Sequence, residues 1–591
     1  MSKKTRLHSI TIAAAALVSL VAAESVTGQP AVPRAAKIAS YLQTNHDFGY
    51  FNGAALVAEG DRVLFKGGFG LADMSWEIPN SASTKFQIGS VTKQFTAALI
   101  LQLVEAGKLE LDDPVTKILP DYPAAQGDRI TIDHLLTHTA GIPSYTGFPD
   151  FMTFTRNQYA VDSLVAMFSG LPLEFDPGTS WSYSNSGYYL LGAIIEEIEG
   201  RPYDEVLRDR ILEPLGLDDS GYDDRTAVIK QMASGYLKLG SEYQRAPYTD
   251  ASVPYAAGMM YSTVEDLYKW DQALYDRGPF ERRETNELFL EPQIAMAEDD
   301  ESAGQYGFGW IFGDQAVGAD TAHIVMHGGG IFGFSTGFWR IPDERRTVIL
   351  MDNTGSSSLG QIGEGLIQIL YGQEPEMPKQ GIASVLRPVI EAEGVDAAVA
   401  RYQELRETDP EAYNFGEGQL NELGYQYLSA DRPDIAIRIF QLNVDQYPES
   451  ANTYDSLGEA YLEAGDRDQA IANYRKALEL NPGFPSARRM LEQLGIEVDE
   501  PDVELSIDEL EEYVGTYAVA PTFSLDITRE GEQMYVQGTG QPRVEIFPRA
   551  KDRFYLTAVD AQITFHRGES GEVESLTLHQ AGQNLPAPKS K

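Results

Sequence analysis

The stretch Phe86-Gln87-Ile88-Gly89-Ser90-Val91-Thr92-Lys93-Gln94-Phe95 places a glycine, a serine and a lysine at the entry of an apolar helical segment. Ser90 and Lys93 are three residues apart, and this spacing puts two side chains on one face of a helix. Unpaired N–H groups at a helix N-terminus favour negative charge, including that of an attacking alkoxide. The pair indicates a serine nucleophile beside an amine. Taken alone, it also fits an N-cap serine with an exposed lysine.

Length and composition limit the classes of protein. A chain of 591 residues is too long for one core, so we expect about three or four domains. The formal net charge of -42 argues against nucleic-acid partners and anionic membranes, which require basic surfaces. The absence of cysteine excludes disulfides, a thiol nucleophile and thiolate metal ligands.

Residues 1–28 have the pattern of a secretory signal peptide. A basic start containing Lys3, Lys4 and Arg6 precedes the apolar run Ile10–Ala23, which is too short to span a membrane comfortably. Cleavage before Glu24 and cleavage near residues 27–29 both fit. The pattern predicts a periplasmic or secreted protein with no membrane span in its mature form.

Residues 34–373 are predicted to form an α/β domain. An amphipathic helix at 34–47 is followed by an apolar hairpin at 53–58 and 62–71, and residues 110–300 are mostly helical. Strand-like runs return after residue 300, at 307–312, 322–326, 333–340 and 346–351. We therefore expect one antiparallel sheet assembled from both ends of the segment, flanked by helices and carrying a helical insertion.

Residues 382–498 contain an internal repeat with an offset of 34 residues. The first set, Leu423, Gly424, Tyr427, Ala436, Phe440 and Pro448, recurs as Leu457, Gly458, Tyr461, Ala470, Tyr474 and Pro482. This is the pattern of tetratricopeptide helix pairs, and residues 396–410 resemble a third, degraded helix. Since one repeat cannot bury its apolar face alone, the array should pack on its neighbours. It is predicted either to bind a protein partner or only to bridge domains.

Residues 505–583 change to a two-residue hydrophobic period. Short strand-like runs alternate with turns that contain glycine or aspartate, from residue 523 to residue 579. The pattern predicts a small antiparallel, lipocalin-like β-barrel. No set of residues in it suggests chemistry.

Three further motifs accompany the serine–lysine pair. Tyr183-Ser184-Asn185 lies in a loop rich in serine, asparagine and glycine, which by itself is typical of a turn. His327-Gly328-Gly329-Gly330 follows a predicted strand, and the alternative to a functional His327 is a structural strand-end residue. His138-Thr139-Ala140-Gly141 follows a short helix, and we expect His138 to hold its loop through backbone hydrogen bonds.

In order and rough spacing, these motifs resemble those of the serine β-lactamase superfamily. The similarity is to its class C-like branch, which includes esterases, D-aminopeptidases and D,D-carboxypeptidases. It covers roughly residues 35–372. Further similar blocks are Leu135–Ile142, Pro177-Gly178, Ala257–Thr263 with Asp266, and Tyr306-Gly307-Phe308-Gly309-Trp310.

The resemblance implies roles for particular residues. Ser90 would form an acyl-enzyme, and Lys93 and Tyr183 would relay the proton. Asn185 would hydrogen-bond Lys93 and a substrate amide. The backbone N–H groups of Ser90 and Gly330 would form an oxyanion hole, with roughly 3 kcal/mol per donor. The implied substrate-binding residues are Asn185, His327, Gly329 and Gly330.

The third motif departs from the family pattern. Lactamases and penicillin-binding enzymes typically carry Lys-Thr-Gly, and this chain has His327-Gly328-Gly329. An imidazole is largely neutral above a pKa of about 6.5, so recognition of a substrate carboxylate is in doubt. Esterases and D-aminopeptidase-like members tolerate histidine here.

The sequence therefore predicts a periplasmic or exported serine hydrolase acting on an ester or amide bond of a small molecule or peptide. The alternatives are a β-lactamase or D,D-carboxypeptidase, and a catalytically silent scaffold that uses its repeats. We expect no metal or cofactor: no His/Asp/Glu spacing fits zinc or calcium, and Gly328–Gly330 lacks the lysine of a phosphate loop.

Overall fold

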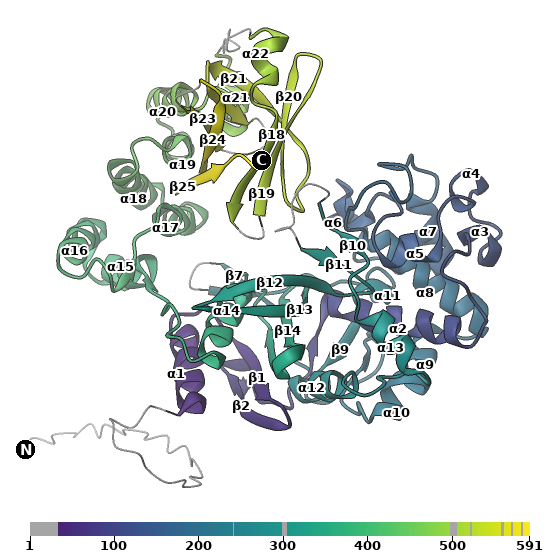
Figure 1. Ribbon diagram of the computed structural model, residues 1–591. Helices are drawn as coiled ribbons and strands as arrows, with labels where there is room; N and C mark the ends of the chain where they lie inside the picture. The colour runs from purple at the N-terminus through teal and green to yellow at the C-terminus, as the bar shows by residue number, and fades with distance from the viewer. Residues whose placement is uncertain are drawn as a thin grey trace, which may run out of the picture.

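The computed structural model describes residues 33–590 apart from 240–241, 298–303, 497–504, 521–522, 557–558, 560, 569–570 and 581–582. The predicted signal peptide at 1–28 lies outside the described residues. The described chain comprises an N-terminal α/β part, a helical array and a C-terminal barrel (Figure 1). Within these residues, no helix has the length and apolar character needed to cross a membrane.

One antiparallel sheet organises the α/β part, and its two ends come from distant segments. Strands before residue 70 pair with strands after residue 290, as predicted, because β1 pairs with both β2 and β15. The order is β10-β11-β12-β13-β14-β15-β1-β2. The strands are β1 (Gly53–Glu59), β2 (Arg62–Phe69), β10 (Ile294–Ala295), β11 (Gln305–Tyr306), β12 (Ile311–Val317), β13 (Asp320–Ile331), β14 (Phe334–Ile341) and β15 (Arg346–Asp352).

The strand predicted at 307–312 is confirmed only at its end, because Ile311 and Phe312 begin β12. Residues 307–310 form a turn between β11 and β12, closed by the Gly307 N–H donating to the Trp310 carbonyl at 2.8 Å. Gly309 has φ of 81°, and an added Cβ would lie 2.9 Å from the Gln94 backbone. The alternating aromatic residues of this segment therefore cover a helix instead of continuing a strand.

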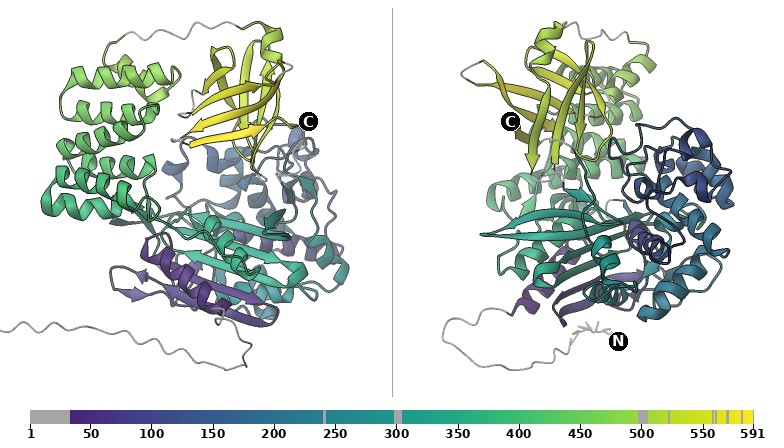
Figure 2. Two further views of the ribbon diagram at one scale, coloured as in Figure 1. Left: turned by 60° about the vertical axis from the view of Figure 1, so that its left-hand side comes forward. Right: turned by 45° about the vertical axis from the view of Figure 1, so that its right-hand side comes forward.

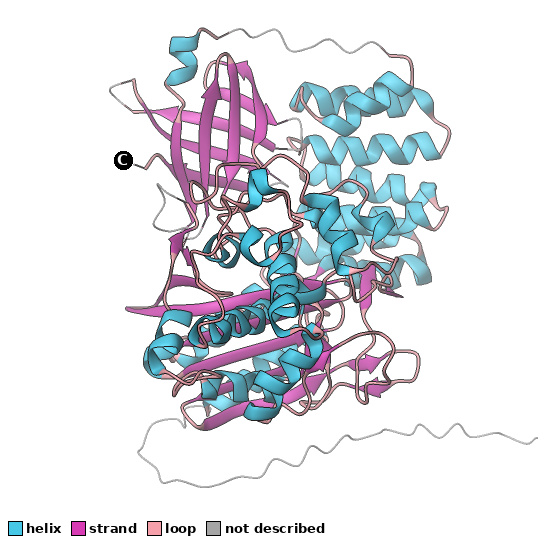
Figure 3. Ribbon diagram, turned by 90° about the vertical axis from the view of Figure 1, so that its right-hand side faces the viewer, coloured by secondary structure: helices cyan, strands magenta, loops and turns pink. Residues whose placement is uncertain are grey.

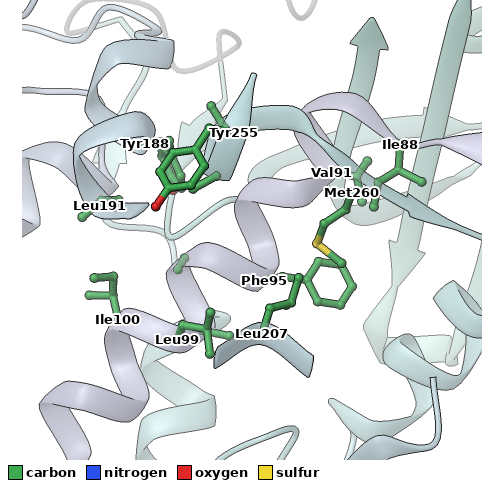
Figure 4. Close-up of a cluster of buried hydrophobic side chains, with 14 of the residues drawn as sticks. Ile88, Val91, Phe95, Leu99, Ile100, Tyr188, Leu191, Leu207, Tyr255 and Met260 are labelled. Atoms are coloured by element: carbon green, nitrogen blue, oxygen red, sulfur yellow. The ribbon is translucent and has the colours of Figure 1, made fainter. Parts of the chain in front are cut away.

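Both faces of β1 are buried, because its alternate residues enter different cores. Ala55 and Val57 pack with α1 (Arg34–Asp47) and α14 (Leu359–Leu370), whereas Ala54 and Leu56 face the larger core. That larger core contains α2 (Thr92–Glu105) and α8 (Asn185–Glu199). Figure 4 shows its centre, where Phe95 and Leu99 of α2 lie among side chains that include Tyr188, Leu207 and Met260.

The segment between β2 and β10 supplies short strands and the helical insertion. Gly200 ends α8 in the left-handed conformation that favours glycine. The remaining elements are β3 (Leu71–Asp73), β4 (Ile78–Pro79), β5 (Phe86–Gln87), η1 (Gly89–Val91), α3 (Val115–Ile118), α4 (Ala124–Gly127), α5 (Ile132–Leu136), η2 (Tyr145–Gly147), α6 (Phe151–Phe154), α7 (Val161–Phe168), α9 (Tyr203–Leu207), η3 (Arg208–Leu212), α10 (Glu213–Leu215), β6 (Gly221–Tyr222), β7 (Tyr236–Leu239), β8 (Glu242–Arg245), α11 (Tyr255–Gly258), β9 (Met260–Ser262), α12 (Val264–Ala273) and α13 (Arg283–Phe289).

The helical array consists of stacked antiparallel helices that rise from the α/β part to the level of the barrel (Figure 2). Each repeated glycine lies where two helices of a pair approach closely: a Cβ on Gly458 would lie 2.9 Å from the Tyr474 ring, and Gly424 meets Phe440 in the same way. The helices are α15 (Ile382–Glu393), α16 (Val395–Thr408), α17 (Glu417–Ser429), α18 (Pro433–Gln446), α19 (Ala451–Glu463), α20 (Arg467–Leu480) and α21 (Pro485–Gln493), with a short parallel pair of β16 (Gln380–Gly381) and β17 (Tyr413–Asn414).

The C-terminal barrel is an eight-stranded antiparallel sheet that nearly closes on itself (Figure 3). A bridge between Tyr517 and Lys589 brings its first and last strands together. Sequence reasoning missed both of these strands. After α22 (Ile507–Glu511), the strands are β18 (Gly515–Ala520), β19 (Phe523–Glu530), β20 (Gln533–Gly538), β21 (Val544–Ala550), β22 (Arg553–Leu556), β23 (Ala561–Arg567), β24 (Val573–Gln580) and β25 (Gln583–Pro588).

The barrel packs against the end of the array. The Arg549 guanidinium donates hydrogen bonds to the carbonyls of Glu479 and Leu480 at the end of α20. This places a cation at the negative end of the helix dipole. The Tyr555 ring lies so close to Gly483 that a side chain there would overlap it. The array therefore holds the barrel through both polar and close-packed contacts.

Candidate active site

Ser90 lies in η1, a single 3-10 turn that leads into α2. The turn begins at Gly89, whose φ of 51° suits glycine. The Ser90 side chain is half-buried, and Lys93 is fully buried one turn later. The predicted i, i+3 contact is present, although Ser90 precedes the α-helix proper.

The Lys93 ammonium is surrounded by oxygen atoms. Its Nζ donates to Ser90 Oγ at 3.2 Å, to Asn185 Oδ1 at 2.8 Å and to the Ala257 carbonyl at 2.8 Å. These three acceptors match the three protons of an ammonium group. Burial lowers the pKa of Lys93 well below its usual value, which favours the neutral amine. In that form Nζ can accept the proton of Ser90 across the same short distance.

Tyr183 completes the group that the sequence predicted. Its ring centroid lies 4.9 Å from Lys93 Nζ, and the Ser90 side chain is near enough to its hydroxyl to stabilise a phenolate there. Burial raises the pKa of Tyr183 above its usual range, so the phenol keeps its proton at neutral pH. The two shifts assign different tasks, because a neutral amine accepts a proton and a protonated phenol donates one.

Close backbone contact joins η1 to β13 beside Ser90. A Cβ added to Gly329 would lie 1.9 Å from the Ile88 carbonyl oxygen and 3.3 Å from the Ser90 nitrogen. A Cβ added to Gly89 would lie 2.7 Å from the Gly330 nitrogen. Glycine at both positions therefore lets the backbones of Ser90 and Gly330 lie side by side, as an oxyanion hole requires.

A chain of hydrogen bonds links His138, Tyr306 and His327 next to the catalytic group. The Ser184 N–H donates to His138 Nδ1 at 3.2 Å, so the other nitrogen of a neutral His138 carries the proton and donates to the Tyr306 hydroxyl at 3.1 Å. At the other end, His327 Nδ1 must donate to the Gly328 carbonyl at 2.6 Å, and Tyr306 is 3.2 Å from His327 Nε2. The Tyr306 hydroxyl therefore donates to His327.

Both imidazoles of this chain are uncharged. Burial, followed by the nearby Lys93, lowers the pKa of His327 to about 4, and the same causes lower the pKa of His138. His327 is 3% exposed, and its two ring nitrogens are both engaged. Its predicted role in substrate binding stays a prediction, and the geometry favours positioning. The expected backbone contact of His138 is present at Ser184.

Sequence reasoning did not single out Tyr306 or the Ala257 carbonyl as parts of the site. Tyr306 stands in a block that resembled the family, but no local pattern links it to His138, 168 residues away. A backbone carbonyl has no side-chain signature in any sequence. Both contacts arise only when the helical insertion folds back on α2.

A cavity of about 490 Å³ opens at Ser90. Its polar lining includes Ser90, Thr146 and Asn185, and Asn185 Nδ2 donates to Thr146 Oγ1 at 3.0 Å. The rest of the wall is mostly apolar or glycine: Phe151, Leu237, Val253, Pro254, Ala257, Gly258, Gly330, Ile331, Phe332, Gly333, Phe334 and Gly355, with Tyr145, Thr249 and Ser335. Among the described residues, no group of three or more His, Asp and Glu side chains could hold a metal ion.

An antiparallel sheet flanked by helices, with a buried lysine between a serine and an asparagine, defines a serine hydrolase of the β-lactamase fold. The beta-lactamase family model matches residues 43–368, more than half of the chain, and the chain belongs to that family. A tetratricopeptide repeat model matches 451–484, and a domain of unknown function (DUF3471) matches 500–587.

Two relatives and one solved structure extend the comparison. Penicillin-binding protein 4* of Bacillus subtilis is 27% identical over 92% of this chain and 95% of its own length. Putative penicillin-binding protein PbpX of the same organism is 32% identical over 57% of this chain and 79% of its own. The octameric penicillin-binding protein homologue from Pyrococcus abyssi shares the fold at a TM-score of 0.51, with 20% identity over 94% of this chain and 99% of its own.

Proposed function

We propose that this protein is a periplasmic or exported hydrolase that cleaves an ester or amide bond through an acyl-enzyme on Ser90. One observation carries the proposal: Lys93 Nζ lies 3.2 Å from Ser90 Oγ while Asn185 and Ala257 fix its other two bonds. This is the contact between nucleophile and base that covalent catalysis requires.

The first half of the reaction forms the acyl-enzyme. Ser90 Oγ attacks the substrate carbonyl carbon while its proton passes to the neutral amine of Lys93. The carbonyl oxygen becomes negatively charged and is held by the N–H groups of Ser90 and Gly330. When the tetrahedral intermediate collapses, the bond to the leaving group breaks, and that group takes a proton from the Tyr183 phenol. The Tyr183 phenolate then takes up the proton that Lys93 received, so that both groups are restored.

The second half uses water. A water molecule attacks the acyl carbon of the ester on Ser90 and gives one proton to the Lys93 amine. Collapse releases the acid product, and Ser90 Oγ takes the proton from Lys93, which becomes a neutral amine again. In total, one water is consumed for each bond cleaved, and no oxidant, reductant or metal is used.

Labelling by a fluorophosphonate probe tests this proposal. Wild type should be labelled at Ser90, whereas Ser90→Ala should not be labelled and should lose turnover of p-nitrophenyl esters. An unlabelled, inactive wild type would contradict the proposal and favour the catalytically silent scaffold. Export is tested separately by fractionation of cells, where removal of residues 1–28 should retain the protein in the cytoplasm.

A second candidate is reaction with β-lactams or D,D-peptides, which the names of the two Bacillus relatives favour. The same acyl transfer would apply, but the site has a histidine where the resembling enzymes have lysine. A chromogenic cephalosporin tests this candidate. Rapid turnover that His327→Ala abolishes would support it, and stable labelling without turnover would indicate a penicillin-binding protein.

The array has two proposed roles. Its contacts with the barrel through Arg549 support a bridge between domains. Recruitment of a protein partner is the other proposal, and a pull-down with the full chain from a periplasmic extract tests it. Recovery of the same partner by Ser90→Ala would show that binding does not depend on catalysis.

A further inference from the structure

Among the residues that the structure describes, the interior of the active site offers no free cationic hydrogen-bond donor to a substrate. Lys93 is fully buried, and its Nζ already has three hydrogen-bond partners at 2.8–3.2 Å. A carboxylate that approached Lys93 would have to displace either the nucleophile or one of the two groups that hold the amine. Either displacement would disable the pair that the reaction requires.

His327 cannot take over this task. Its Nδ1 proton is used by the Gly328 carbonyl, and its Nε2 lone pair accepts from Tyr306. The groups that surround it are Lys93, Tyr183 with its ring 6.2 Å away, and Tyr306. Tyr306 is fixed in turn by His138, so rotation of one member would break two bonds of the chain.

The cavity wall is also uncharged. None of the described residues that line it is Asp, Glu, Lys, Arg or His. Asp250, next to the lining residue Thr249, accepts hydrogen bonds from the Ser252 N–H and hydroxyl and from the Tyr248 hydroxyl. An ammonium group in the cavity would therefore find no carboxylate, and burying an unpaired charge is costly.

The side chains that line the cavity are mostly apolar and can pack against apolar groups of a substrate. Phe151 of α6 and Phe332 of the β13–β14 turn have ring centroids 6.3 Å apart, and both line the cavity with Phe334 and Leu237. Its volume of about 490 Å³ lies within the range of small-molecule sites. Apolar burial in such a site contributes roughly 0.8 kcal/mol per CH₂ group.

We infer that the site selects substrates whose acyl part is apolar and carries no charge, which makes a neutral carboxylic ester or amide the substrate class. This inference rests on the proposed function. It separates this protein from a D-aminopeptidase, whose substrates carry an ammonium group, and from an enzyme that recognises a free carboxylate.

Three p-nitrophenyl esters with one leaving group test the inference: hexanoate, 6-aminohexanoate and the monoester of adipic acid. At pH 7 the first is neutral, the second is cationic and the third is anionic. We expect kcat/KM to be at least 100-fold higher for hexanoate than for either charged ester. Values within fivefold of one another would overturn the inference.

Two variants at one lining residue make the test specific. Leu237 is half-buried in β7, so a polar replacement should fold. Leu237→Asp should raise the ratio of the two turnover rates, 6-aminohexanoate over hexanoate, at least tenfold. Leu237→Asn should not raise this ratio, because asparagine is nearly the same size as aspartate but carries no charge. An equal effect of both variants would contradict the role of charge in the cavity.

Labelling with the fluorophosphonate distinguishes a failure of this inference from a failure of the proposed function. If the fluorophosphonate fails to label Ser90 and no ester is hydrolysed, the proposed function fails. If Ser90 is labelled and all three esters react at similar rates, the proposed function stands and the inference about charge is wrong.

Discussion

Replacement of Gly329 by alanine should disable the enzyme without unfolding it. The new Cβ would lie 1.9 Å from the Ile88 carbonyl oxygen, whereas carbon–oxygen contacts normally exceed about 3.3 Å. The backbones of β13 and η1 must therefore separate by more than about 1 Å. The separation moves the Gly330 N–H away from the Ser90 N–H, on the other side of the oxyanion hole.

The expected loss is large. Removal of one oxyanion-hole donor costs roughly 10²–10³ in kcat, and a displacement of about 1 Å can cost about 10²-fold. We therefore expect kcat for a p-nitrophenyl ester to fall at least 100-fold in Gly329→Ala, with a smaller change in KM. Stopped-flow release of p-nitrophenol under single-turnover conditions would show that acylation itself is slowed.

Gly328→Ala is the matched control. A Cβ at Gly328 would have its nearest neighbour, the Thr336 carbonyl oxygen, at 3.8 Å, which is an ordinary contact. Gly328→Ala should keep kcat within about threefold of wild type, and both variants should retain the near-ultraviolet circular dichroism of the wild type. If Gly329→Ala retains wild-type kcat, the contact between η1 and β13 does not set the oxyanion hole, and the reasoning fails.

The remaining predictions concern the base, the hydrogen-bond chain and the barrel. Since the reaction needs a neutral Lys93 whose pKa is lowered, kcat/KM should fall as pH drops through that lowered pKa, and Lys93→Arg should be inactive at every pH tested. Tyr306→Phe removes the hydrogen bond that His327 Nε2 accepts but leaves its burial and Lys93 in place, so the pKa of His327 should stay well below 6.5 in an imidazole NMR titration; a pKa near 6.5 would contradict burial as the main cause. The same variant leaves two buried groups unpaired and should lower the unfolding free energy by about 2–5 kcal/mol in urea denaturation. Arg549→Ala should loosen the barrel from α20, which small-angle scattering would detect as a larger radius of gyration, while ester hydrolysis continues; unchanged scattering would show that the packing at Gly483 suffices.

Much of the fold could be predicted because its patterns are local. The apolar runs of β1 and β2 and the 34-residue offset of the array can each be recognised in the sequence alone. The serine–lysine spacing by itself predicts that the nucleophile lies beside its base. Tyr183 and Asn185 came from the resemblance, and the structure brings both to Lys93.

The parts that sequence reasoning missed depend on long-range contacts. Phe308, Trp310 and Phe312 alternate like a strand, but Gly309 turns the chain against Lys93–Gln94. The direction of the hydrogen bonds through Tyr306 is set by the Ser184 N–H at one end and the Gly328 carbonyl at the other. Those partners are distant in the sequence, so no window of neighbouring residues contains the information.

Because the barrel is attached to α20, the repeats act as a spacer between the barrel and the α/β part. Arg549 and Gln562 both bond to carbonyls at the end of that helix, so the barrel's position follows the length of the stack. Inserting one more 34-residue unit would shift the barrel outward by one layer and leave Ser90 and its neighbours untouched. Evolution could thus change the reach of this molecule without altering its chemistry.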